Sequence, residues 1–157
     1  MKKEASLSII EDIKNRKVLM IKHLRGVNKG FYNFCGGKKE EGETMEECVR
    51  RETLEETGLV IENPKQVGYI EFPSMEYYVS IFKSTKFYGD VKAREGEVEV
   101  FWQDIDSIPL DKMRDADKDY VPQIMSGKYV NKRYVYDENG KVVSMVDLSL
   151  EELNKTR

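Results

Sequence analysis

Residues 37–59 constrain the fold of this chain more than any other part of the sequence. A glycine-rich turn at Gly36-Gly37 leads through Thr44 into a run of good helix formers that stops at Gly58. Thr44 and Glu47, three residues apart, fit a capping box, and Gly58 stands where a left-handed residue ends a helix. We therefore expect a loop followed by a capped helix.

One face of this expected helix changes from apolar to acidic along its length. At about 100° per residue, Met45, Cys48, Val49, Glu52 and Glu56 lie on the same side. The two carboxylates are four residues apart and repel each other unless a cation lies between them. A hard divalent ion such as Mg²⁺ is a natural counter-charge, because it takes oxygen ligands and often binds carboxylates together with substrate phosphates.

A purely structural interpretation fits the same residues. Residues 37–58 contain eight Glu and four Lys or Arg, and pairs such as Glu46-Arg50 and Glu47-Arg51 can join on an exposed helix. Such pairs stabilise a helix by tenths of a kcal/mol each, so the acidic face could be a solvated surface and nothing more. The combination of glycine turn, helix cap and carboxylate spacing favours a site.

Composition limits the classes of protein to which this chain can belong. With 157 residues, we expect a single domain over residues 1–157. The 26 basic and 29 acidic residues give a net charge of −3, so a nucleic-acid partner is not expected. The N-terminus lacks the apolar run of a signal peptide, and no segment approaches membrane-spanning length. We therefore expect a cytoplasmic protein without a membrane partner, as a monomer or a homodimer.

The two cysteines, Cys35 and Cys48, do not have the spacing of a metal-binding motif. Free thiols are the default for an intracellular protein. Cys48 is expected in the core because it lies on the apolar stripe. Cys35, beside the glycine turn, could be an exposed thiol.

Segments with strand-like patterns surround the expected helix. They are residues 5–11, 17–24, 31–34, 60–63, 66–72, 77–88, 97–104, 128–136 and 141–148. The polar turn 12–16 joins the first two as a hairpin, and Asn139-Gly140 predicts a second hairpin. Residues 118–125 look helical, with Pro122 predicting a helix start or kink. The tyrosine-rich cluster of Tyr77, Tyr78 and Phe82 is expected in the core. This order of elements predicts an α+β protein with a mixed β-sheet.

The residue types and their spacing between Gly37 and Leu59 resemble the Nudix box of the MutT/Nudix hydrolases. The matching positions are Gly37, Glu43, Arg51-Glu52, Glu55-Glu56 and Gly58-Leu59. One position departs, because the family has a bulky aliphatic residue where this chain has Thr53. We expect a slightly poorer contact between helix and sheet there, without an effect on catalysis. The resemblance covers nearly the whole chain and implies the Nudix-type α/β/α sandwich.

The resemblance also implies an activity and a set of site residues. Hydrolysis of a phosphoanhydride requires neutralised phosphate charge and a water aimed at phosphorus, which metal ions and a base can supply. The implied Mg²⁺ ligands, which would also accept Mn²⁺, are Glu52, Glu55, Glu56, Glu97 and the backbone carbonyl of Gly36. The implied catalytic residues are Arg51, Glu52 and Glu55, with Arg51 orienting a carboxylate. Lys38 and Arg25 are candidate phosphate contacts, and each can equally be a solvated cation.

Residues outside the box resemble the branch that hydrolyses oxidised purine nucleoside triphosphates. By this resemblance Asn33 hydrogen-bonds the base, Phe72 lines the pocket and Asp117 reads the purine edge. A site built for particular hydrogen bonds discriminates because a wrong base leaves its polar groups unpaired. Two positions depart: Arg114 replaces a stacking Trp, and Ala116 replaces the first of two neighbouring Asp residues. Arginine can also stack on a base.

The sequence thus predicts a Mg²⁺-dependent enzyme that converts a nucleoside triphosphate to a monophosphate and pyrophosphate. The expected substrates are modified purines such as 8-oxo-dGTP. One alternative is another compound with a nucleoside diphosphate group, namely a nucleotide sugar, a dinucleoside polyphosphate or a capped RNA. A second alternative is a module that senses a nucleotide without hydrolysing it, although such a module should have lost box carboxylates that this chain retains. His23, the only histidine, is not expected to be catalytic, because carboxylates already supply ligands and base.

Overall fold

The computed structural model of the protein describes residues 2–148. Its strands are β1 (Lys3–Asp12), β2 (Lys17–His23), β3 (Tyr32–Asn33), β4 (Cys35–Lys38), β5 (Val60–Glu62), β6 (Lys65–Phe72), β7 (Tyr77–Ser84), β8 (Lys86–Tyr88), β9 (Val98–Asp104), β10 (Val130–Tyr136) and β11 (Val142–Asp147). The α-helices are α1 (Met45–Thr57) and α2 (Asp117–Met125), and short 3-10 turns are η1 (Pro73–Met75), η2 (Ile105–Ser107) and η3 (Leu110–Lys112). The charged segment 151–157 lies outside the described residues.

Helix α1 forms with the predicted caps at both ends. The Glu47 N–H donates to the Thr44 hydroxyl at 3.1 Å, and the Thr44 N–H donates to the Glu47 carboxylate at 2.9 Å. Gly58 ends the helix in the left-handed region, with φ 79°. The α1 side chains of Cys48 and Val49 are fully buried. Burial of the apolar half of the stripe attaches α1 to the sheet and so fixes the direction of the acidic half.

The strands form a mixed sheet. Among the described residues, one nine-stranded sheet has the order β11-β10-β6-β7-β1-β2-β3, with β4 also pairing with β1 and β9 with β2. Strand β1 runs parallel to β7, and β10 runs parallel to β6. The remaining neighbours are antiparallel, and β5 pairs with β8 in a separate two-stranded sheet.

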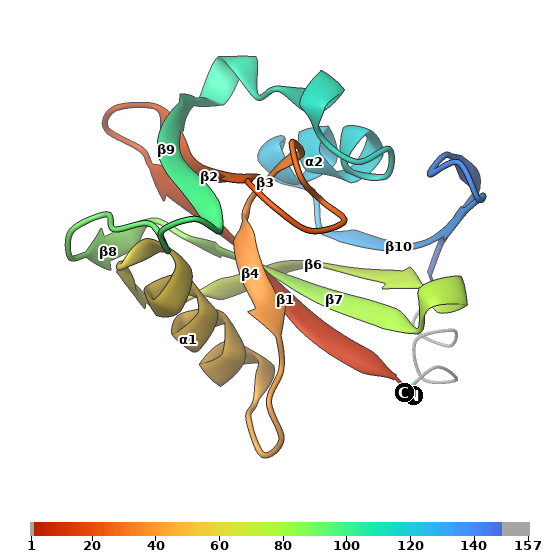
Figure 1. The fold of residues 1–157 in the computed structure, drawn as a ribbon, viewed down its shortest axis with the longest axis horizontal. Coiled ribbons are helices and arrows are strands. Elements are labelled where there is room, and N and C mark those ends of the chain that lie inside the picture. The colour runs from red at the N-terminus through yellow and green to blue at the C-terminus, as the bar shows by residue number, and fades with distance from the viewer. Residues whose placement is uncertain (1, 149–157) are drawn as a thin grey trace.

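The sheet separates two apolar clusters. Val121 and Ile124 of α2 belong to the first cluster, whereas Val49 of α1 belongs to the second. Successive side chains of a strand point to opposite faces, and accordingly Ile9 and Ile10 of β1 fall into different clusters. Helices α1 and α2 lie on opposite sides of the central strands (Figure 1). The α+β class and the α/β/α arrangement are therefore as predicted.

The predicted glycine turn at Gly36-Gly37 is wrong, because both residues lie inside strand β4. Gly36 is paired with Leu7 of β1, and Gly37 with Ser6. A Cβ atom on Gly36 would lie 2.1 Å from the Ser6 carbonyl oxygen. Glycine is needed here for close approach of two strands instead of for a turn.

Other boundaries differ from the predictions in two places. The segment predicted as one strand, 77–88, divides into β7 and β8, because β8 leaves the main sheet to pair with β5. Helix α2 begins at Asp117, five residues before Pro122, so a helix start near Pro122 is wrong. The remaining predicted strands and both hairpins are confirmed to within two residues.

The two cysteines are both buried. Cys48 is in the core as predicted. The suggestion of an exposed thiol at Cys35 is wrong, because this side chain is 0% exposed. Burial, and secondarily the charge of Glu56, raises the pKa of the Cys35 thiol to about 12. An inert core cysteine is the consequence.

Across residues 2–148, the helices all fall short of the length and apolar character required to cross a membrane.

Candidate functional site

Strand β4 lies directly against the acidic face of α1. The Gly36 N–H donates to the Glu56 carboxylate at 3.1 Å. A Cβ atom on Gly37 would lie 2.3 Å from the carboxyl carbon of Glu52. Glycine at position 37 thus leaves room for the Glu52 side chain against the strand, and the backbone N–H of Gly36 contacts Glu56.

Arg51 is the centre of an ion-pair network on this face. It donates to both carboxylate oxygens of Glu43, and its Nη1 donates to Glu52 at 2.8 Å and Glu55 at 3.2 Å. A further bond of 2.9 Å joins its Nη2 to the Lys38 carbonyl oxygen. The hydrogen bonds from Arg51 lower the pKa of Glu43 to about 2. Arg51 therefore contacts three carboxylates, and its role in catalysis stays a prediction.

The predicted partner of Arg51, Glu47, is occupied by the helix cap. The other predicted pair is formed, because the Arg50 Nε lies 3.4 Å from the Glu46 carboxylate. Glu46 is exposed, whereas Arg50 is half-buried and also donates to the Ile61 carbonyl oxygen at 2.9 Å. One face of α1 therefore carries a single ion pair, and the other face carries a network of linked ion pairs.

A second arginine connects the helix to the loop before β9. Arg94 lies 3.4 Å from the Glu55 carboxylate and 3.3 Å from the Glu97 carboxylate. Glu97 also accepts a bond of 2.6 Å from Arg25. The structure thus brings Glu97 to the acidic face of α1, and it pairs Arg25 with a predicted metal ligand.

Glu56 is the most deeply buried carboxylate of the acidic face. Burial, helped by the negative charges of Glu52 and Glu97, raises the pKa of Glu56 to about 7, although the Gly36 N–H and Arg94 oppose the shift. Within residues 2–148, no three Asp, Glu, His or Cys side chains are close enough together to hold a metal ion as they stand. These side chains nevertheless suit a hard divalent ion, because carboxylate oxygens are its preferred ligands. The negative carboxylates repel one another, and a bound cation would reduce that repulsion.

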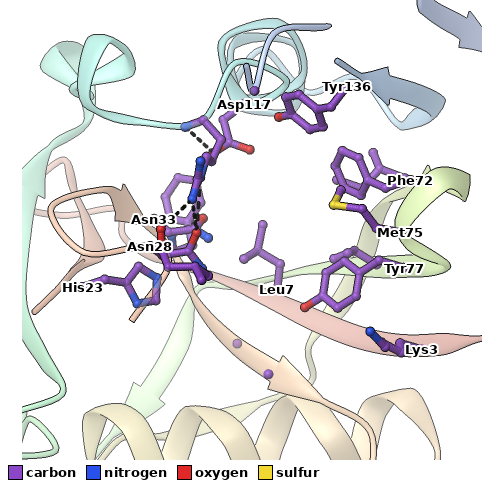
Figure 2. A pocket seen from close by; sticks show the side chains of 18 of the residues that line it. Lys3, Leu7, His23, Asn28, Asn33, Phe72, Met75, Tyr77, Asp117 and Tyr136 are labelled. Carbon is purple, nitrogen blue, oxygen red and sulfur yellow. Dashed lines mark hydrogen bonds between the residues drawn. The ribbon is translucent and has the colours of Figure 1, made fainter. Parts of the chain in front are cut away.

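A cavity of about 870 Å³ opens beside β4. Gly36, Gly37 and Lys38 line its end nearest the acidic face, and Asn33 and Asp117 line it farther on. Figure 2 shows Phe72, Met75, Tyr77 and Tyr136 along one wall, Asn28 and Asn33 along the opposite wall, and Leu7 between them. The cavity therefore joins the glycines of the box to the residues predicted to read a base.

Two polar side chains of the cavity are held in place by backbone N–H groups. The Asn33 side-chain oxygen accepts from the Phe34 N–H at 2.8 Å. The Asp117 carboxylate accepts from the Arg114 N–H at 3.2 Å. Asp117 is only 6% exposed, and this burial raises the pKa of its carboxyl to about 6.

Arg114 forms a wall of the cavity at the position where the related branch has a stacking Trp. Its guanidinium lies 3.9 Å above the ring of Phe31. It also donates to the Asn28 side-chain oxygen and, at 3.1 Å, to the Val27 carbonyl oxygen. Arg114 is therefore a flat, anchored group and not a loose cation. Ala116, the second departure, is buried and donates its N–H to the Tyr136 hydroxyl at 2.8 Å.

The sequence predictions missed part of the apolar wall. Tyr77 packs against the first apolar cluster, as predicted, and it also lines the cavity. Tyr136 also lines the cavity and stacks on Phe72, with ring centroids 5.6 Å apart. Tyr134 and Tyr136 are two residues apart on β10 and so share one face of the strand. That alternation was the available signal for an aromatic wall.

Comparison with known proteins gives related sequences. The family model described as NUDIX domain matches residues 1–124. An oxidized purine nucleoside triphosphate hydrolase of Danio rerio is 32% identical over 126 residues, which cover 78% of this chain and 80% of that protein. The Mus musculus protein of the same description is 31% identical over 133 residues, covering 82% of this chain and 85% of that protein.

Solved structures give the same fold. A Mutator MutT protein from Bacillus halodurans has a TM-score of 0.75 and 24% identity, covering 92% of this chain and 96% of that chain. The MutT protein from Methanosarcina mazei Go1 has a TM-score of 0.66 and 23% identity, covering 78% of this chain and 91% of that chain. These likenesses confirm the predicted fold class.

Proposed function

The chain belongs to the Nudix family and is a Nudix hydrolase, and from this premise we propose that it hydrolyses nucleoside triphosphates to a monophosphate and pyrophosphate. The proposed substrates are modified purine nucleotides such as 8-oxo-dGTP. The observation that carries the proposal is the continuous cavity from Gly36 and Gly37 to Asn33 and Asp117. A triphosphate at the glycine end would place its base among the polar and aromatic groups at the other end.

The proposed metal site lies on the acidic face of α1. Nudix hydrolases generally use divalent metal ions. The residues that would hold Mg²⁺, or Mn²⁺ in its place, are Glu52, Glu55, Glu56, Glu97 and the Gly36 carbonyl group. When bound, the ion supplies neutralisation of phosphate charge and a water with a lowered pKa.

The side chains around this site would orient the reacting groups. Arg51 contacts both Glu52 and Glu55, and in this proposal it orients these carboxylates for the reaction. A carboxylate there can accept the proton of the attacking water as its oxygen bonds to phosphorus. The bond from that phosphorus to the oxygen that bridges the α- and β-phosphoryl groups breaks, and the bridging oxygen keeps the electron pair, so that a monophosphate and pyrophosphate are formed. Lys38, which lines the same end of the cavity, would bind a phosphoryl oxygen.

The opposite end of the cavity offers a way to recognise a purine. Asn33 and Asp117 would hydrogen-bond the base edge, with Asp117 able to donate or accept because its pKa is about 6. Phe72 and Tyr136 would contact the base as apolar surfaces, and Arg114 would stack through its guanidinium plane. Polar groups in such a pocket reject a base that leaves them unpaired.

The experiment that tests this function is pyrophosphate release with Mg²⁺ across a substrate panel. The panel contains 8-oxo-dGTP, 2-hydroxy-dATP, the four normal dNTPs, ADP-ribose and a diadenosine polyphosphate. A clear preference for an oxidised purine triphosphate is the expected result. Turnover of a different compound alone would overturn the substrate assignment, and no turnover would favour a sensing module.

The metal site is tested with two charge-removing variants. Glu52→Gln and Glu56→Gln should each lower kcat by roughly 100-fold or more, because each removes a ligand of the ion that stabilises the transition state. Glu46→Gln is the matched control, since Glu46 lies on the exposed side of the same helix. Mn²⁺ binding to the free protein should weaken in the first two variants only. Similar activity in all three variants would contradict the assignment.

A further inference from the structure

A second cavity lies at the far end of α2 and β6 from the first. Its volume is about 580 Å³. Helix α2 contributes Asp117 to the first cavity and Ile124 to the second, and β6 contributes Phe72 to the first and Lys65 to the second. The charged side chains that line it are four lysines and one carboxylate, Lys65, Lys83, Lys86, Lys128 and Glu62. This cavity is therefore lined mainly by basic side chains, although the whole chain has a net charge of −3.

The lysines of this cavity are only partly neutralised, because Lys83 forms an ion pair and Lys86 lies opposite Glu62 on the antiparallel strands β5 and β8. Lys65 and Lys83 are direct partners on antiparallel strands β6 and β7, and like charges in that position destabilise a sheet. The Lys83 ammonium lies 2.7 Å from the Glu11 carboxylate. Within the part of the chain that the structure describes, no ion pair is formed by Lys65, Lys86 or Lys128. An anion in the cavity would relieve this repulsion.

The remaining walls suit a small ligand. Val67 and Ile124 provide apolar surface, and the ring of Tyr129 is 58% exposed at the edge. The last carbonyl groups of α2 accept the N–H groups of Ser126, Gly127 and Lys128. The negative end of the helix is therefore capped. The cavity volume falls within the range of about 300–1,000 Å³ that is usual for small-molecule sites.

We propose that this second cavity binds a small anion with two or more phosphoryl groups. Lys65 belongs to β6, Lys86 to β8, and Lys128 follows α2. A ligand with more than one phosphoryl group can contact cations that come from three separate elements. Inorganic pyrophosphate and nucleoside polyphosphates share this chemistry, and the exposed Tyr129 ring adds a surface on which a base can stack. The site is separate from the hydrolytic cavity and does not depend on hydrolysis.

The test is a titration of the ¹⁵N-labelled full chain with inorganic pyrophosphate, in EDTA to remove divalent ions, followed by amide chemical shifts. Saturable shifts of Lys65, Gln66, Gly127 and Lys128 are expected. Lys65→Glu and Lys128→Glu should each weaken apparent affinity by roughly tenfold, because each removes a charge-assisted contact. Lys14→Glu, in the exposed turn after β1, makes the same charge change and should have little effect.

The outcomes separate a built site from general attraction of anions. Equal weakening in all three variants, shifts that do not saturate, or shifts confined to residues of the first cavity would overturn the proposal. Lys65→Gln removes only the charge and replaces Lys65→Glu if that variant fails to fold. Because catalysis is not measured, failure of the proposed hydrolytic function would leave this result unchanged.

A second titration distinguishes the two sources of phosphoryl groups. A non-hydrolysable nucleoside triphosphate replaces pyrophosphate, and Tyr129→Ala is compared with the unchanged chain. If the variant weakens nucleotide binding alone, the site recognises a nucleotide through its base as well as its phosphates. If nucleotide and pyrophosphate bind equally in both proteins, the site recognises phosphoryl groups only. Absence of binding by both probes at the second cavity would overturn the proposal.

Discussion

Arg51 donates to both carboxylate oxygens of Glu43, from Nε and from Nη2. Glu43 also accepts the Glu40 N–H at 2.8 Å, so the loop before α1 is connected to the helix through one carboxylate. The remaining contacts of the same guanidinium reach Glu52 and Glu55. The Arg51 side chain therefore connects the loop before α1 to two carboxylates on the acidic face.

We expect Arg51→Lys to lower kcat by roughly 10- to 100-fold. A small displacement of catalytic groups from the geometry of the reaction can reduce the rate by this amount. An ammonium group cannot reproduce the planar, two-pronged contact of a guanidinium with a carboxylate. The measurement is kcat on the preferred substrate, with thermal unfolding as a test of folding. Arg16→Lys is the control, since Arg16 forms an exposed ion pair with Asp106 away from the acidic face. Equal losses in both variants would refute this role of Arg51.

Replacing each glycine of β4 by alanine should separate folding from catalysis. At Gly37 the new Cβ would meet the flexible end of the Glu52 side chain, so Glu52 can move and the strand can stay. At Gly36 it would meet the Ser6 backbone, which cannot move without parting β1 from β4. Gly37→Ala should lose activity with little change in thermal stability, whereas Gly36→Ala should lower the unfolding temperature. The reverse pattern would contradict these contacts.

The sequence was sufficient to predict features that depend on local interactions. The cap of α1 by Thr44 and Glu47 needs only neighbouring residues, and the acidic stripe follows from helical periodicity. The position of Arg94 between Glu55 and Glu97 depends instead on how the loop before β9 closes over α1. Tyr136 lines the first cavity at the end of β10, a strand that pairs with β6 and so joins distant parts of the chain. Periodicity carries no information about such pairings.

Arg94 is expected to compete with a divalent ion, because its guanidinium contacts two of the proposed ligands. Arg94→Ala should strengthen Mn²⁺ binding to the free protein several-fold, since a like charge near the ion is removed. Arg94→Lys retains the positive charge and should bind Mn²⁺ with nearly unchanged affinity. The measurement is Mn²⁺ binding by electron paramagnetic resonance without substrate. Unchanged affinity in Arg94→Ala would show that this arginine does not occupy the ion's position.

Asn33→Ala should raise KM for the preferred purine triphosphate by roughly tenfold, the loss expected from one hydrogen bond of the base. The KM for a pyrimidine triphosphate should change much less, because Asn33, which lines the first cavity (Figure 2), is proposed to bind the purine base. The two substrates are compared in the same variant, which controls for altered folding. Equal increases for both would place the base away from Asn33.

Asp117 should make the folded state less stable as pH rises. Burial raises its pKa from 3.8 to about 6, so the folded state holds the proton more tightly than the unfolded state does. The resulting stabilisation is complete below pH 3.8 and is lost as pH rises through 6, by up to about 3 kcal/mol for a shift of this size. Asp117→Asn stays neutral and avoids the loss, so it should exceed the unchanged chain in stability at pH 8 but not at pH 4. Urea unfolding of both proteins at these two pH values measures the difference, and an effect independent of pH would show that Asp117 does not titrate in the folded state.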